Sequence, residues 1–126
     1  IENGIRKIGV VFNLDVHTGP GTHWVSVYIN VPRKKIYFFD SYGDDPPDQL
    51  LKFCNNVKLQ AKKKGLNYDI EISDKRHQYS DGECGMYSLY FIIQMLKGVK
   101  FEDFNRKRVA DSKMRKFRKK YFNIPE

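Results

Sequence analysis

A cysteine at position 84 stands where a polar loop runs into a strongly apolar segment, and this placement could make it a nucleophile. Residues 78–83 read QYSDGE, and residues 84–96 read CGMYSLYFIIQML. A thiol at the start of a helix lies at the positive end of the helix dipole, which lowers its pKa. Free first-turn N–H groups could bind an oxyanion there, and Gly85 would let a substrate backbone come close. The alternative is a small buried cysteine that begins a core helix.

Three other residues have the side chains that a thiol nucleophile needs. His23 follows a Gly/Pro-rich turn and begins a strand-like run, so its ring could be aimed to deprotonate the thiol. Asp40 ends the next run, and in a hairpin it would lie near His23 and orient the ring. Gln78 could donate to an oxyanion without titrating. Taken singly, each has a plainer interpretation: a strand-capping histidine, a turn aspartate and a solvated glutamine.

Other candidates for these roles are less well placed. His17 lies in the Gly/Pro-rich turn, and His77 is near Cys84 in sequence, which does not make it near in space. Asp44 and Asp45 lie in the loop that follows Asp40.

The second cysteine, Cys54, is expected to be structural. Neither cysteine has another Cys or a His at metal-ligand spacing, so we expect no metal, and nothing predicts a cofactor. Two cysteines are too few for a disulfide scaffold, which favours a reducing compartment. That predicts the cytoplasm or nucleus.

The elements that must position these residues can be predicted from the hydrophobic pattern. Strands are expected over residues 8–14, 23–31, 36–39 and 68–72. Helices are expected from near Pro47 to Lys64, then over residues 84–96, 101–108 and 112–121. The helix at 84–96 is apolar nearly all round, which is typical of a helix buried inside a domain. The order predicts an α+β fold, in which a mixed or antiparallel sheet packs on this central helix that starts at Cys84.

Length and composition indicate one globular domain, residues 1–126, with residues 97–126 as a basic helical tail. The chain has 126 residues and 40% hydrophobic residues, and no run approaches the ~20 apolar residues of a membrane span. We therefore expect no membrane partner. Because the chain begins at Ile1 and runs almost directly into a strand, we expect it to lack an N-terminal part of the domain.

The positive charge is confined to the tail. Residues 97–120 hold eleven Lys/Arg and three Asp/Glu, a net charge of +8, whereas the rest holds twelve of each sign. The tail could contact nucleic acid or an acidic protein, and the plainer alternative is a solvated helix face.

Taken together, these residues resemble the ubiquitin-like-protein-specific cysteine protease family of the papain-like clan, the SUMO-protease and adenain type. The matching pieces are His23-Trp24 opening a strand, Phe39-Asp40-Ser41 closing the next, Gln78 six residues before Cys84-Gly85, the loop Asp81-Gly82-Glu83 and the buried helix. The resemblance covers roughly residues 8–97.

The resemblance implies roles for five residues. His23, Asp40 and Cys84 would form a catalytic triad, with Gln78 in the oxyanion hole. Trp24 would cover the glycine-containing C-terminal tail of a protein substrate, although a core aromatic is the plainer interpretation of this residue.

The same resemblance implies a thiol protease that cleaves peptide or isopeptide bonds after Gly-Gly or Gly-X. Residues 108–122 resemble the ending of proteases from large DNA viruses. This implies viral structural precursors as substrates rather than a ubiquitin-like modifier, and the virion or host cytoplasm as the location. The chain is shorter than usual for the family, which leaves the choice between these substrates open. Two further alternatives are an inactive relative that binds a ubiquitin-like tail or a partner protein, and a nucleic-acid-binding module. The first is disfavoured because a pure binder need not keep all four catalytic residues.

Overall fold

The computed structural model describes residues 6–15, 22–79 and 84–122. In chain order the elements are β1 (Lys7–Asp15), β2 (Thr22–Asn30), β3 (Lys35–Phe39), α1 (Asp48–Lys63), β4 (Asp69–Ile72), α2 (Cys84–Leu96), α3 (Phe101–Arg106) and α4 (Asp111–Phe122). The predicted strands and helices are thus present, with most ends shifted by one or two residues.

The strands form one mixed sheet in the order β1-β2-β3-β4. The pairs β1–β2 and β2–β3 are antiparallel, and β4 runs parallel to β3. A parallel neighbour needs a crossover connection, and α1 supplies it between β3 and β4. The α+β prediction with a mixed sheet is confirmed.

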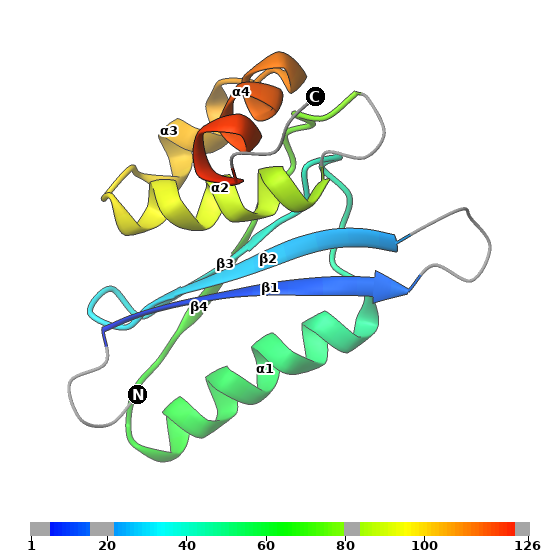
Figure 1. Cartoon of the computed structure of the whole chain (residues 1–126). Helices are drawn as coiled ribbons and strands as arrows, with labels where there is room; N and C mark the ends of the chain where they lie inside the picture. The colour runs from blue at the N-terminus through cyan, green and yellow to red at the C-terminus, as the bar shows by residue number, and fades with distance from the viewer. Residues whose placement is uncertain (1–5, 16–21, 80–83, 123–126) are drawn as a thin grey trace.

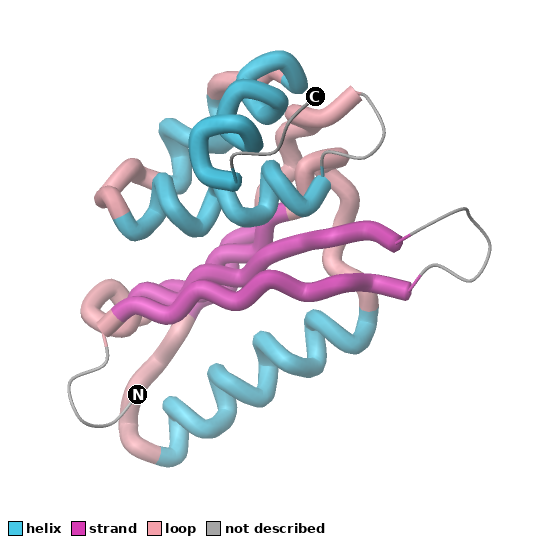
Figure 2. The backbone as a smooth tube through the Cα atoms, in the orientation of Figure 1, coloured by secondary structure: helices cyan, strands magenta, loops and turns pink. Residues whose placement is uncertain are grey.

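Helices cover both faces of the sheet: α1 lies on one face, and α2, α3 and α4 lie on the other (Figures 1 and 2). This follows from the alternation of side chains along β2, where Val25, Val27 and Ile29 share a core with α1, and Tyr28 shares one with α2. From the sequence we expected a single helix packed on the sheet, and the position of α1 was not predicted. Cys54 points into the α1 core and is 1% exposed, as expected of a structural cysteine.

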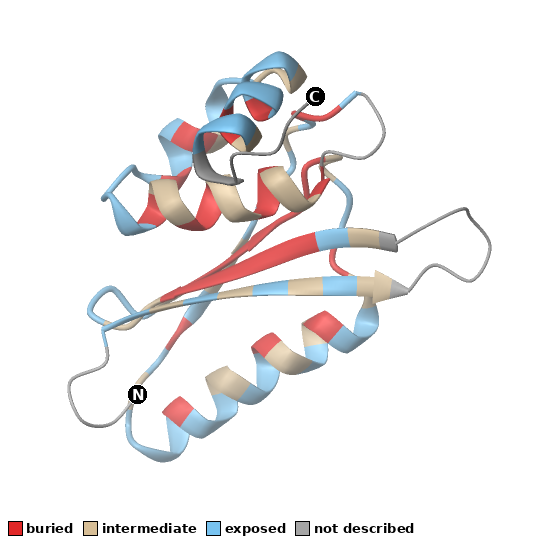
Figure 3. Cartoon of the chain, viewed as in Figure 1, coloured by how far each residue is buried: buried red, intermediate tan, exposed pale blue. Residues whose placement is uncertain are grey.

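The central helix α2 is held between the sheet and the C-terminal helices. Its Phe91 ring stacks on Phe39 of β3 at 4.7 Å, and its Tyr90 ring meets Phe117 of α4 edge-on at 5.2 Å. Figure 3 shows the resulting band of buried residues along β2, β3 and α2. The helix that begins at Cys84 is therefore held on two sides.

Helix α3 ends at Arg106, two residues before the predicted end at Arg108. Lys107 has an extended backbone, with φ −114° and ψ 122°, and the next two residues leave the helix to bond His77. Among the described residues, no helix has both the length and the apolar character to cross a membrane.

Candidate active site

The antiparallel pairing of β2 and β3 brings His23 and Asp40 to the same end of the sheet. Ser26 pairs with Phe39, so the start of β2 and the residue that follows β3 lie side by side. The Nε2 of His23 donates a hydrogen bond to Oδ1 of Asp40 at 2.9 Å. The same oxygen accepts the N–H of Tyr42 at 2.8 Å, and the Tyr42 ring stacks on the His23 ring at 5.1 Å. The carboxylate and the imidazole are therefore both held in place.

The imidazole of His23 connects the carboxylate to the thiol. Because Nε2 is engaged by Asp40, the other ring nitrogen, Nδ1, is the one available to Cys84. Hydrogen bonds to Asp40 and then to Cys84 raise the pKa of His23 well above its usual 6.5, against the opposing effect of burial. The imidazole is therefore held in its protonated form at neutral pH.

The thiol of Cys84 has the matching shift. Burial raises its pKa, but hydrogen bonds from His23 and from the backbone N–H of Trp24 outweigh it, so the pKa lies below its ordinary value. The Trp24 N–H lies 3.4 Å from Sγ. For Cys54, burial raises the pKa. Of the two cysteines, Cys84 is thus the one whose thiolate form is stabilised by its surroundings.

Gln78 is not the solvated loop residue of the plainer interpretation, because it is fully buried. Its backbone N–H donates to the carbonyl of Ser41 at 2.9 Å, and the Ser41 hydroxyl donates to its Oε1 at 2.6 Å. The loop Asp81-Gly82-Glu83, which contributed to the family resemblance, lies outside the described residues.

Trp24 and Gly85 face each other beside the thiol. A Cβ placed on Gly85 would lie 3.6 Å from Cδ1 of Trp24, and the indole is 36% exposed. The indole is therefore not a core aromatic. Its exposed ring stands next to the first turn of α2, where Gly85 adds no side chain.

The competing residues are not brought to the thiol. His77 is fully buried, its Nδ1 accepts the N–H of Val109 at 2.8 Å, and burial lowers its pKa to about 4. Asp44 and Asp45 are exposed, and His17 lies outside the described residues. In the described part of the chain, no group of three or more Cys, His, Asp or Glu could hold a metal ion.

Several residues around the site were not identified from the sequence. They are Ser41, Tyr42, Arg76, Tyr87, Arg108 and Asp111. One signal was present: a tyrosine inside an otherwise apolar buried helix needs a partner for its hydroxyl group, and Tyr87 is such a residue. For Ser41, Arg108 and Asp111, the contacts join partners 31 to 37 residues apart, and no local pattern reveals them.

Comparisons with known proteins identify relatives over nearly the whole chain. The sequence model described as "Ulp1 protease family, C-terminal catalytic domain" matches residues 7–126. The cysteine protease S273R of African swine fever virus (isolate Tick/Malawi/Lil 20-1/1983) is 36% identical over 98% of this chain and 46% of its own length. The putative thiol protease R355 of Acanthamoeba polyphaga mimivirus is 32% identical over 97% of this chain and 41% of its own length. The chain thus spans less than half the length of these relatives.

Solved structures agree with the fold. A crystal structure of the selenomethionine form of the African swine fever virus pS273R protease superimposes with a TM-score of 0.86 and 34% identity, over 95% of this chain and 45% of that one. The C-terminal Ulp1 protease domain in complex with Smt3, the yeast orthologue of SUMO, gives a TM-score of 0.61 over 87% of this chain and 48% of that one. Its identity is 15%, so it shows a shared fold alone. The resemblance that the sequence suggested is confirmed.

Proposed function

The chain belongs to the Ulp1 protease family, C-terminal catalytic domain, and on this premise we propose that it is a thiol protease whose nucleophile is Cys84. The observation that carries the proposal is the line of contacts from Asp40 through His23 to the thiol, with a raised pKa on the imidazole and a lowered pKa on the thiol. These shifts favour a thiolate–imidazolium pair, which is the reactive form of a cysteine nucleophile. An inactive relative that only binds its partner would not need a thiolate–imidazolium pair.

The reaction proceeds in two steps. The Cys84 thiolate attacks the carbonyl carbon of a peptide or isopeptide bond, and the carbonyl oxygen becomes an oxyanion. Protonated His23 gives its proton to the leaving amine, and a thioester to Cys84 forms. Neutral His23 then takes a proton from water, which attacks the thioester. The collapse of that intermediate expels the Cys84 thiolate beside protonated His23 and releases a carboxylic acid, which gives its proton to solvent. Asp40 orients the ring in both steps.

The oxyanion needs hydrogen-bond donors that are already in place. The backbone N–H groups at the first turn of α2 have no partners within the helix, and they point to the end where Cys84 lies. We assign the side-chain amide of Gln78 as a further donor, since it is neutral at every working pH and is held rigidly by Ser41.

The substrate class follows from Trp24 and Gly85. The exposed indole of Trp24 lies close to Gly85, which has no side chain, and this pair suits a substrate tail of glycines better than one with side chains. Relatives carry the name SUMO-1 cysteine protease, and one neighbouring structure is Cdu1 bound to ubiquitin. We therefore propose cleavage after Gly-Gly or Gly-X, in a ubiquitin-like modifier conjugate or in a viral precursor. A reducing compartment, the cytoplasm, nucleus or virion, would keep the thiol active.

Peptides that end in Gly-Gly before a fluorescent leaving group should be hydrolysed, whereas matched Ala-Ala peptides should be cleaved at least about tenfold more slowly, because extra methyl groups meet the Trp24 ring. SUMO and ubiquitin that carry a C-terminal electrophile are assayed in parallel. An adduct with either modifier marks a deconjugating enzyme, and peptide cleavage without an adduct marks precursor processing. Equal rates on both peptides would contradict the assigned specificity.

A second proposal concerns the basic tail, which we infer contacts nucleic acid in support of the protease. A groove of about 450 Å³ lies between α2 and α4, and exposed lysines rim it. Its lining residues are Tyr90, Gln94, Lys97, Lys113, Lys116, Phe117 and Lys120. The Lys113 ammonium lies 5.4 Å from the centre of the Tyr90 ring. Lysines around an aromatic floor are the combination that binds single-stranded nucleic acid.

Replacing Lys113 and Lys116 with glutamine should weaken the binding of a short single-stranded oligonucleotide. The slope of log K against the logarithm of the salt concentration should become shallower by roughly 1.4, about 0.7 for each lost phosphate contact. Fluorescence anisotropy over a range of salt concentrations measures both. The control replaces Lys62 and Lys63, exposed lysines of α1 on the opposite face, and should change neither. Equal effects from the two pairs would indicate diffuse charge attraction and remove the groove as a site.

A further inference from the structure

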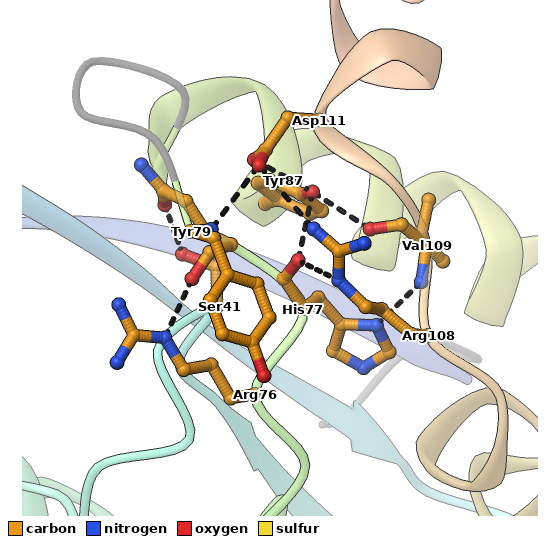
Figure 4. A network of polar contacts seen from close by, with 9 residues as sticks. Ser41, Arg76, His77, Tyr79, Tyr87, Arg108, Val109 and Asp111 are labelled. Atoms are coloured by element: carbon orange, nitrogen blue, oxygen red, sulfur yellow. Dashed lines mark hydrogen bonds and ion pairs between the residues drawn. The ribbon is translucent and has the colours of Figure 1, made fainter.

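The segment that carries Gln78 has no regular secondary structure, and yet two of its residues, His77 and Gln78, are fully buried. A segment of this kind must satisfy its backbone groups by contacts with other parts of the chain. Figure 4 shows that it does so through polar contacts from Ser41 on one side and from the start of α4 on the other.

Ser41 fixes both the backbone and the side chain of the segment. Its carbonyl accepts the N–H of His77 at 2.8 Å and the N–H of Gln78 at 2.9 Å. Its hydroxyl donates to Oε1 of Gln78 at 2.6 Å. The contact turns the oxygen end of the amide toward Ser41, so the nitrogen, which carries the donors, is the opposite end. Ser41 follows Asp40 directly, so one turn holds both the carboxylate and this serine.

The start of α4 holds the other side of the segment. Arg108 Nε donates to the carbonyl of His77 at 2.8 Å, and the N–H of Val109 donates to its Nδ1. Asp111 Oδ2 accepts the N–H of Tyr79 at 3.2 Å. The Tyr79 ring lies between the guanidinium groups of Arg76 and Arg108, each 4.6 Å from its centre. The residues on both sides of Gln78 are therefore held by α4 or by the residues that directly precede it.

Tyr87 ties this arrangement to the helix of the nucleophile. Its hydroxyl group lies 2.7 Å from the carbonyl of Val109, 3.0 Å from Oδ1 of Asp111 and 3.2 Å from the carbonyl of His77. Because Tyr87 is three residues after Cys84 on α2, the helix that presents the thiol also holds the segment that presents Gln78.

From these contacts we propose that Ser41 and Asp111 are positioning residues that hold the Gln78 amide with its nitrogen as the donor to the oxyanion. The inference rests on the proposed function and adds α4 to the parts on which catalysis depends. An oxyanion donor must lie within about 2.7–3.1 Å of the developing charge. An amide turned end for end would offer an oxygen there instead and would repel that charge.

The test is a pair of double-mutant cycles measured on Gly-Gly peptide hydrolysis. Gln78→Ala should lower kcat by roughly a hundredfold or more. Ser41→Ala should lower kcat about tenfold with little change in KM, since it leaves the buried Oε1 of Gln78 without this donor. Asp111→Asn should lower kcat about three- to tenfold, since it weakens the contact that holds the backbone N–H of Tyr79. When Gln78 is already alanine, neither change should cost more than about a further twofold, because both act through its amide.

Matched controls separate positioning from a general loss of structure. Ser26→Ala removes a buried serine hydroxyl that has no hydrogen-bond partner among the described residues, and Asp103→Asn breaks an exposed i,i+3 ion pair with Arg106. Both should keep wild-type kcat. A Ser41 or Asp111 loss that persists in full when Gln78 is alanine would overturn the inference, as would wild-type kcat in both variants.

These outcomes are distinct from failure of the proposed function. An unchanged rate in Gln78→Ala would remove Gln78 from the oxyanion hole, and the positioning inference would fall with it. A large loss in Gln78→Ala with no loss in Ser41→Ala and Asp111→Asn would leave the protease mechanism intact and overturn the positioning role alone.

Discussion

Replacing Cys84 with alanine is expected to abolish hydrolysis of Gly-Gly peptides, by a factor of about 10⁵ or more, while the fold is retained. Without the sulfur atom no thioester can form, and the remaining oxyanion donors give only weak acceleration over water. Cys84 is 7% exposed and is the first residue of α2. The loss of its sulfur atom leaves the buried aromatic rings of that helix in contact with the sheet. Steady-state rates and thermal unfolding measure the two outcomes.

The matched control for this variant is Cys54→Ser. Cys54 is equally buried but lies in the α1 core on the other face of the sheet, away from His23. Turnover should stay within about twofold of wild type, although a buried hydroxyl in place of a thiol should lower the unfolding temperature. Retained hydrolysis in Cys84→Ala, or its loss in Cys54→Ser with the fold intact, would show that the nucleophile has been assigned to the wrong cysteine.

Replacing His23 with glutamine is expected to lower turnover at pH 7 by roughly 10³- to 10⁴-fold, because two effects combine. The proton carrier for the leaving amine is lost. The largest influence that lowers the pKa of Cys84 is also lost, and burial, which raises that pKa, then dominates. At pH 7 the thiol would therefore stay protonated, and no imidazole would be present to protonate the leaving amine.

The two effects can be separated by the pH dependence. In the wild type, rates rise with pH as Cys84 loses its proton, below the ordinary thiol pKa of 9.0, and fall at alkaline pH as His23 loses its proton above its ordinary 6.5. In the His23 variant, the residual rate should keep rising beyond pH 9 with no alkaline fall from an imidazole. The control is His17→Gln, at one of the two other histidines considered as the base, and it should keep the wild-type profile. A wild-type profile in His23→Gln would contradict the assignment.

The elements of this fold could be predicted from the sequence because each has a clear local pattern. The aromatic and β-branched residues of β2 and the apolar run in α2 identify both without knowledge of any neighbour. The location of α1 could not be predicted, since an apolar stripe shows that a helix is buried but not against which face. The end of α3 was placed two residues too far, because Arg108 and Val109 leave the helix to bond His77, and that contact is not encoded locally.

The site was predictable to the same degree. His23 and Asp40 could be placed together because a hairpin brings the two strand ends to one edge, and Cys84 because it opens the buried helix. The positions of Ser41 and Asp111 could not be predicted. Their partners, Gln78 and Tyr79, are 37 and 32 residues away, and no local pattern links them.

The most direct test of the central claim is the rate at which iodoacetamide alkylates each cysteine of the wild-type chain as a function of pH, followed by peptide mass spectrometry. The measurement requires no substrate, and Cys54 is an internal control whose pKa burial raises. We predict that Cys84 is alkylated with a midpoint below pH 9 and that the midpoint rises in His23→Gln, where burial, which raises the pKa, loses its main opposing influence. A wild-type Cys84 midpoint at or above pH 9, or one that does not respond to the loss of His23, would contradict the thiolate–imidazolium pair.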